Sequence, residues 1–264
     1  RTAELPNNRS SEPSFSRTVE RVIEEVPAIS QQPSVASAAM RHLIACEVFR
    51  DEFEAVCPPE MPRTYIEQGL HRTPGKMPEA IQAVVDGLPA ATETVILGYG
   101  LCSNGVVGVA ARLAPIIIPK VHDCIAVLLG SVKRYEAEME VCAGTYYITP
   151  GWAKYGTTSL SAYKDEYLPK YGEEDARYVV EECLKHYTRI AFIDHGAGDV
   201  ELGRAHAKEF AETFGKRYEE IPGDLDYLRR LVSGPWDSGD FLTIPPGTTI
   251  DQAPFLGLHS ISLP

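Results

Sequence analysis

The stretch TVILGYGLCSNG, residues 94–105, joins a short apolar run to a turn rich in glycine. An apolar run of this length, bounded by glycine, is typical of a strand buried in a parallel sheet. Two further segments have the same organisation, HLIACE at residues 42–47 and APIIIPKVHDC at residues 114–124. Each of the three segments places a cysteine just beyond its apolar run. We therefore expect neighbouring parallel strands that carry their cysteines at one edge of a sheet.

Strand-like and helix-like segments alternate along the rest of the chain. KMPEAIQAVVDGL at residues 76–88 has the spacing of an amphipathic helix, and RIAFID at residues 189–194 is another buried strand. The pattern also predicts helices at residues 106–113 and 124–139. Strands separated by helices of this length form βαβ units. The predicted fold class is α/β and Rossmann-like, a mostly parallel sheet with helices on both faces and a ligand site at the carboxyl edge of the strands.

Length and composition predict one folded domain behind an N-terminal arm. The chain has 264 residues, of which 44% are hydrophobic and 23% are charged, ordinary values for a globular protein. Residues 1–36 are rich in Ser, Pro, Asn and Glu, which predicts a mobile arm. The alternation of strands and helices begins at residue 37. We therefore expect a single α/β domain over residues 37–264.

Charge and cysteine content exclude several kinds of partner. The formal net charge of −12 argues against a nucleic-acid-binding surface. No segment approaches the roughly 20 apolar residues of a membrane span, so no membrane partner is expected. Six cysteines are too few for a disulfide scaffold in a chain of this length. No signal segment opens the sequence, which predicts a cytoplasmic protein with reduced thiols. A homo-oligomer is left open.

Cys46, Cys102 and Cys124 are the candidate metal ligands. Soft thiolates gathered at one point select zinc, copper(I) or an iron–sulfur cluster. Three protein ligands with one open position suit catalytic zinc, and they equally suit a [4Fe–4S] cluster with one open iron. A single cysteine at a strand end is also common as a small buried hydrophobic residue, so the hypothesis depends on the three converging. Structural roles are expected for Cys57, Cys142 and Cys183.

The turn around Cys102 is the strongest local motif. Gly100 and Gly105 permit close backbone approach, and Asn104 tolerates the left-handed region. The helix expected directly after this turn would present free N–H groups beside the thiol, lower its pKa and favour an anion or a metal. Gly100, Asn104 and Gly105 are therefore candidates for binding a substrate or anion. The alternative is a tight turn around an inert buried cysteine.

Two further groups of residues are candidates for the same site. His122 stands two positions before Cys124, so both can reach one metal; the alternative is that His122 and Asp123 merely begin a helix. Tyr147 and Trp152 follow another strand-like segment and could form an aromatic wall for a substrate. Both assignments assume that these segments reach the edge where the cysteines gather.

Asp194 and His195 are the candidate acid–base pair. They follow the buried strand at residues 189–194, so a single parallel sheet would bring them to the edge that holds the thiols. A histidine there can move a proton near neutral pH, and its aspartate neighbour can determine its tautomer. The alternative is that Asp194 caps the following segment while His195 faces solvent.

Several short motifs together resemble the bacterial and archaeal domain-of-unknown-function family DUF1638. They are ACE at 45–47, YGLCSNG at 99–105, HDCI at 122–125, LLGS at 128–131 and GTYY with GW at 144–152. The resemblance extends from about Arg41 to the C-terminus, with Ser103 where the family pattern has glycine. It implies a setting beside corrinoid-dependent methyltransferase systems, and so a corrinoid protein or a methyltransferase as partner.

The candidate residues favour a metal-dependent enzyme with a three-cysteine site that acts on a small molecule. Thiol activation for methyl transfer is the most concrete reaction, because zinc holds a thiolate that remains nucleophilic at neutral pH. Lyase chemistry would suit a cluster. One alternative is a non-catalytic protein that binds a small molecule, cofactor or metal for a partner enzyme. Another is an enzyme with Cys102 as nucleophile and His122 or His195 as base.

Overall fold

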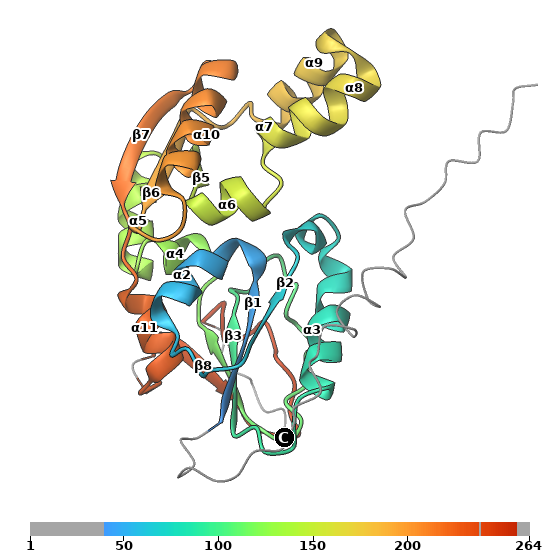
Figure 1. Ribbon diagram of the computed structural model, residues 1–264, viewed down its shortest axis with the longest axis vertical. Helices are drawn as coiled ribbons and strands as arrows, with labels where there is room; N and C mark the ends of the chain where they lie inside the picture. The colour runs from blue at the N-terminus through green and yellow to red at the C-terminus, as the bar shows by residue number, and fades with distance from the viewer. Residues whose placement is uncertain (1–39, 238, 258–264) are drawn as a thin grey trace, which may run out of the picture. The chain divides into compact units, whose positions relative to one another are not determined.

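The protein is described by a computed structural model that covers residues 40–237 and 239–257 (Figure 1). The arm predicted at residues 1–36 lies outside the described residues. The strands of the described part form two sheets, a five-stranded sheet and a three-stranded sheet. A mostly parallel α/β fold of Rossmann-like type is thereby confirmed, with its strands divided between two sheets.

The five-stranded sheet contains the segments that carry the three candidate cysteines. In spatial order its strands are β2 (Arg63–Ile66), β1 (Arg41–Cys46), β3 (Thr94–Gly98), β4 (Ile116–Pro119) and β8 (Phe241–Ile244). The first four are parallel, and β8 pairs antiparallel with β4 at the edge. The order 2-1-3-4 is that of flavodoxin-like sheets, in which the chain changes direction between β1 and β3. Ligands of such sheets bind at that switch point.

Helices and short helical turns flank this sheet. They are η1 (Glu47–Phe49), α2 (Arg50–Val56), η2 (Gln68–Arg72), η3 (Pro74–Lys76), α3 (Met77–Asp86), α4 (Ile125–Leu128), α5 (Val132–Val141) and α11 (Asp226–Ser233). Figure 1 shows α3 on one side of the sheet and α2 with α11 on the other. Within the described residues, every helix falls short of the length and apolarity that crossing a membrane requires.

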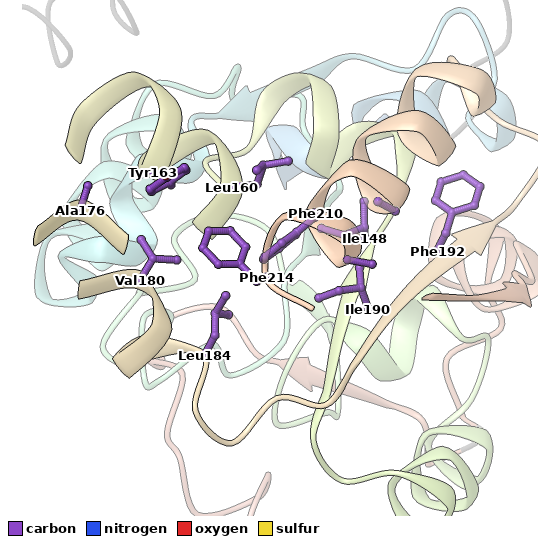
Figure 2. Close-up of a cluster of buried hydrophobic side chains, with 12 residues drawn as sticks. Ile148, Leu160, Tyr163, Ala176, Val180, Leu184, Ile190, Phe192, Phe210 and Phe214 are labelled. Atoms are coloured by element: carbon purple, nitrogen blue, oxygen red, sulfur yellow. The ribbon is translucent and has the colours of Figure 1, made fainter. Parts of the chain in front are cut away.

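The three-stranded sheet is parallel and has its own hydrophobic core. Its strands are β5 (Thr145–Ile148), β6 (Arg189–Asp194) and β7 (Arg217–Pro222), and its helical segments are α6 (Pro150–Tyr155), α7 (Ser159–Ser161), the π-helical η4 (Ala162–Tyr167), α8 (Leu168–Tyr171), α9 (Glu173–Cys183) and α10 (Val200–Thr213). Figure 2 shows side chains of these elements gathered around Phe210 and Phe214. The Phe214 ring meets Tyr163 edge-on, with 5.4 Å between centroids, which anchors η4 to the end of α10.

The two sheets are joined where α6 packs against η1 and α2. A Cβ on Gly151, in the first turn of α6, would collide with the carbonyl oxygen of Val48 in η1. Only glycine lets the two backbones approach this closely. The carboxyl end of β1 and the carboxyl end of β5 are therefore held together by direct backbone contact.

One of the predicted helices is wrong and another is interrupted. Residues 106–113 form turns, with Gly108 at a φ of 88° and Ala110 in an isolated antiparallel bridge with Thr249. This segment takes its hydrogen bonds from the chain near residue 249, and a single-sequence pattern does not contain that pairing. The helix expected at residues 124–139 is divided into α4 and α5, because Gly130 has a φ of 87° and Ser131 caps α5.

Candidate functional site

Four adjacent parallel strands each deliver one sulfur or imidazole to the carboxyl edge of the five-stranded sheet. His71 follows β2, Cys46 ends β1, Cys102 follows β3 and Cys124 follows β4. The Sγ of Cys46 lies 3.5 Å from Nε2 of His71, and the Sγ atoms of Cys102 and Cys124 lie 3.2 Å apart. The structure thus brings the three predicted cysteines to one edge of one sheet, around the switch point between β1 and β3.

Tyr99 is the buried centre of this cluster. Its side chain is on the segment that leads from β3 to Cys102, and the residue is 2% exposed. Burial raises its pKa well above the usual value, and the nearby sulfurs of Cys46, Cys102 and Cys124 raise it further. All three sulfurs therefore lie within electrostatic reach of one ring. His71 stacks on the same ring, with centroids 6.4 Å apart and planes 19° apart.

The turn that carries Cys102 has an uncommon backbone conformation. Cys102, Ser103 and Asn104 have φ values of 48°, 56° and 66°, three consecutive residues in the left-handed region. This conformation costs roughly 1–2 kcal/mol for a residue other than glycine. Strain of this kind concentrates at functional sites, where the surrounding structure maintains it.

The thiols of Cys46 and Cys102 are neutral in the absence of a bound cation. Burial raises the pKa of Cys46 to about 12, and a hydrogen bond with Cys124 together with burial raises the pKa of Cys102 well above its usual value. No helix follows Cys102, so the expectation that a helix N-terminus lowers its pKa is wrong. Burial also lowers the pKa of His71, which keeps its imidazole neutral and free to act as a donor ligand.

The donor atoms suit a soft metal, although they are not arranged around a common point. Two thiolates on one zinc lie about 3.8 Å apart, and a thiolate and an imidazole about 3.6 Å apart, by tetrahedral geometry. The Cys46–His71 distance of 3.5 Å is close to the second value, whereas the Cys102–Cys124 distance of 3.2 Å is about 0.6 Å shorter than the first. Across the described residues, no group of three or more His, Cys, Asp or Glu side chains is positioned to hold an ion. A shared metal therefore requires the two pairs to approach each other.

His122 and Asp123 precede Cys124. His122 binds the Cys102 turn through its backbone, and Asp123 forms hydrogen bonds through its side chain. His122 is exposed, and its carbonyl oxygen accepts a hydrogen bond from the backbone N–H of Cys102. Asp123 accepts from the N–H of Ile125 at 2.8 Å and from the hydroxyl of Tyr135 at 3.0 Å. Asp123 therefore binds the first N–H group of α4, which begins at Ile125. Among the described residues, no hydrogen bond links the His122 imidazole to a sulfur.

The three candidates for anion binding occupy different positions around the turn. Gly100 lies against the backbone of Asp123, where a Cβ would come within 3.0 Å of its carbonyl carbon. Gly105 is buried against the sulfur of Met77. Asn104 is exposed at the tip of the left-handed turn. Gly100 and Gly105 thus serve close packing, and Asn104 alone among the three presents a side chain to solvent.

Asp194 ends β6 and His195 follows it. Because β6 belongs to the three-stranded sheet, these residues do not lie on the sheet edge that carries the thiols. Asp194 accepts a hydrogen bond from the N–H of Gly196 and pairs with Arg204 at 3.1 Å. The His195 side chain is 0% exposed, and its Nε2 donates to the carbonyl of Leu128 at 2.6 Å. The expectation that both share one sheet with the cysteines is wrong, because the strand pairings divide the strands into two sheets.

Glu52 is a residue of this region that the sequence reasoning missed. It is 0% exposed on α2, and its Oε1 lies 3.6 Å from Nδ1 of His195. Burial raises the pKa of Glu52 to about 8, which the nearby Thr149 hydroxyl opposes only weakly. Neither carboxyl oxygen has a hydrogen bond of normal geometry to a described residue. Because Nε2 of His195 is the donor, Nδ1 is an acceptor toward which a protonated Glu52 is directed.

Tyr147 and Trp152 lie on consecutive elements, β5 and α6. Burial raises the pKa of Tyr147. The charge of Arg189, on β6, lowers this pKa, and the charge of Glu138, on α5, raises it. Trp152 lies on α6, close to the junction with Val48. The Tyr147 hydroxyl and the Trp152 indole N–H are both buried without a hydrogen-bond partner among the described residues. A common aromatic wall made by these two residues stays a prediction.

Comparison with known proteins identifies a family and nothing more specific. Residues 65–232 match the model of DUF1638, which is described as a protein of unknown function. No curated protein and no solved structure matches the chain. The matched span includes His71, Cys102 and Cys124, whereas Cys46 lies before it, so the span is shorter than the motifs suggested. Because the match covers more than half of the chain, this protein belongs to the DUF1638 family.

Proposed function

We propose that the protein is a metal-dependent enzyme in which Cys46, Cys102 and Cys124 hold zinc or a [4Fe–4S] cluster and a small molecule is the substrate. The observation that supports this most directly is the delivery of three thiols from three adjacent parallel strands to the switch point of the sheet. Soft sulfur ligands select these metals over hard cations.

The properties of the free thiols agree with a ligand role. Burial and neighbouring sulfurs raise the pKa values of Cys46 and Cys102, and a bound cation opposes both effects because it stabilises the thiolate. Metal binding then releases protons, so affinity rises with pH. His71, neutral and 3.5 Å from Cys46, can provide a fourth donor or accept a proton from the substrate. When bound, the metal would supply a Lewis acid and keep a substrate thiol ionised.

Thiol methylation or lyase chemistry is the reaction class within this proposal. The partner proposed is a corrinoid protein or methyltransferase, and the location is a reducing cytoplasm, where the thiols remain available to metal. A cysteine-nucleophile enzyme is less well supported, because catalytic cysteines have lowered pKa values and the pKa of Cys102 is raised.

The test is metal analysis of protein purified without oxygen. We expect about one zinc per chain by elemental analysis, or the brown absorption of a cluster. Cys46→Ser, Cys102→Ser and Cys124→Ser should each remove at least half of the bound metal. Cys183→Ser is the matched control, because Cys183 is an exposed free thiol on α9.

Substitution of cobalt(II) makes the ligand assignment sharper. Its thiolate-to-metal absorption should fall with each cysteine removed from the site and stay unchanged in Cys183→Ser. Metal-free protein from an anaerobic preparation that also fails to take up zinc or cobalt would contradict the proposal. Bound metal without turnover of any thiol substrate would instead support the non-catalytic metal-binding protein.

A further inference from the structure

We infer that Cys102 and Cys124 form a reversible redox pair, a dithiol that a peroxide converts to an intramolecular disulfide. Their Sγ atoms are 3.2 Å apart, and all six cysteines are free. A disulfide bond is about 2.05 Å long, so the sulfurs need to approach by only about 1.2 Å. This inference goes beyond the proposed function, since it requires no metal.

Backbone hydrogen bonds hold the segments of the two cysteines side by side. The N–H groups of Leu101 and Cys102 donate to the carbonyls of Val121 and His122 at 2.9 and 3.0 Å. These bonds hold Cys102 beside His122, two residues before Cys124. The left-handed turn that begins at Cys102 directs this pairing, because it ends the extended segment where the two sulfurs meet.

Cys46 and Cys142 have neighbours other than a second thiol. Cys46 is 1% exposed and has His71 as its neighbour, while Cys142 lies 3.4 Å from the hydroxyl of Thr188. Cys124 is half-buried, whereas Cys102 is 8% exposed. A peroxide in solvent therefore reaches Cys124 first, and Cys102 is the thiol behind it.

The reaction has two balanced steps. Cys124 loses its proton, and the thiolate attacks one peroxide oxygen. The O–O bond breaks, Cys124 becomes a sulfenic acid, and the departing hydroxide takes up the released proton to form water. The Cys102 sulfur then attacks the Cys124 sulfur, the S–O bond breaks, and the hydroxyl leaves as water with the proton of Cys102. Two thiols lose two electrons in total, and the peroxide accepts them. An external dithiol returns the pair to its reduced form.

Oxidation of this pair and metal binding exclude each other, because the disulfide removes two of the three proposed ligands. A peroxide would therefore release the metal, and a bound metal should slow oxidation. This competition allows the redox pair and the metal site to be tested separately in one set of experiments.

The experiment treats the full chain, reduced and metal-free, with hydrogen peroxide and then alkylates the remaining thiols. Intact mass should show the loss of two of six thiols per chain, and peptide mapping should identify the bond Cys102–Cys124. Dithiothreitol should restore six thiols. Cys183→Ser is the control, because it removes an exposed thiol and should form the same disulfide at the same rate.

Three results would overturn the inference: a disulfide that joins a different pair, oxidation of Cys124 to sulfinic acid without a disulfide, or an unreacted pair under conditions that oxidise Cys183. Zinc-loaded protein gives the independent arm. Protection of the pair by zinc supports both proposals. If zinc binds without protecting the pair, the ligand assignment is contradicted and the redox pair stands. If the protein takes up no zinc but forms the disulfide, the metal site is contradicted and the redox pair again stands.

Discussion

Glu52 is a carboxyl group in a position that helix geometry reserves for apolar side chains. With Phe49, Phe53 and Val56 it occupies the spacing i, i+3, i+4, i+7, and this face of α2 is turned toward the protein interior. Burial removes water from the carboxylate and disfavours its charged form. The pKa of Glu52 therefore rises to about 8, and the group stays protonated at neutral pH. His195 Nδ1 is the acceptor beside it.

The pH dependence of stability follows from this pair. An unfolded glutamate ionises near pH 4.5, whereas folded Glu52 keeps its proton up to about pH 8. The folded state thus binds more protons than the unfolded state within this window, and stability falls there as pH rises. His195 has a lowered pKa, so its contribution is lost as pH falls below 6.5.

Glu52→Gln should therefore stabilise the protein increasingly as pH rises. Between pH 6.5 and 8, the free energy of unfolding of the variant should gain about 2 kcal/mol relative to the parent. Urea unfolding at pH 6.5, 7.2 and 8 measures the difference. Glu79→Gln on α3 is the control, because that side chain is exposed and its variant should follow the parent at every pH. Parallel curves for the parent and Glu52→Gln would show that Glu52 is ionised in the folded state.

Local patterns identified the three cysteines but not their neighbours. Each cysteine follows an apolar run, so the carboxyl-edge rule places it from sequence alone. His71 lies in a polar segment after β2, and it reaches Cys46 only because β2 pairs with β1. Pairing of that kind is a long-range property that periodicity does not contain. Glu52 did have a local signal, its position in the apolar stripe of α2.

Among the elements, α6 and η1 pack against each other where the two sheets meet. The sequence predicted a strand-like segment before Trp152, and the structure adds a short helix, α6, that begins at Pro150. Thr149 caps this helix by accepting from the N–H of Trp152. The absence of a side chain at Gly151 allows η1 to lie directly on its first turn.

Gly151→Ala should separate α6 from η1. The new methyl group would collide with the carbonyl of Val48, which is backbone and cannot rotate away. We expect a loss of about 1–3 kcal/mol in the free energy of unfolding, the usual cost of overpacking. Gly75→Ala is the matched control, because a Cβ at Gly75 meets nothing within 4 Å. An unchanged urea midpoint in Gly151→Ala would mean that this contact opens without cost.

Elements near the cysteines show why helix prediction failed where it did. The segment at residues 106–113 has helical composition, yet Ala111 exchanges backbone hydrogen bonds with residues near Thr248. This strand-like pairing replaces the helix and removes the helix N-terminus expected beside Cys102. The consequence is chemical as well as structural, because the Cys102 thiol then has no dipole that would lower its pKa.

For the molecule as a whole, the number of sheets was the least predictable property. The alternation of strands and helices is the same whether consecutive strands pair or not. β4 takes as its outer neighbour β8, from far along the chain, and β5 begins a second sheet instead. The two sheets nevertheless share buried contacts, because His195 donates to Leu128 and Gly151 lies on Val48.

These shared contacts predict that the two sheets unfold together. The chain has two tryptophans, and each reports on one sheet. Trp152 lies on α6, beside the three-stranded sheet, while Trp236 donates from its indole to Leu231 of α11 and stacks with Arg41 of β1. In the variant Trp236→Phe, Trp152 is the single remaining tryptophan. In Trp152→Phe, the single remaining tryptophan is Trp236.

Within each single-tryptophan variant, the fluorescence and the far-ultraviolet circular dichroism should give one urea midpoint and one slope. Comparison within a variant removes the effect of the substitution on overall stability. Coincident transitions are the signature of a single cooperative unit. A fluorescence midpoint that precedes the dichroism in the Trp152 reporter alone would show that the three-stranded sheet unfolds first. The contacts of His195 and Gly151 would then be too weak to couple the sheets, and the cysteine edge would belong to a sheet that is stable without its neighbour.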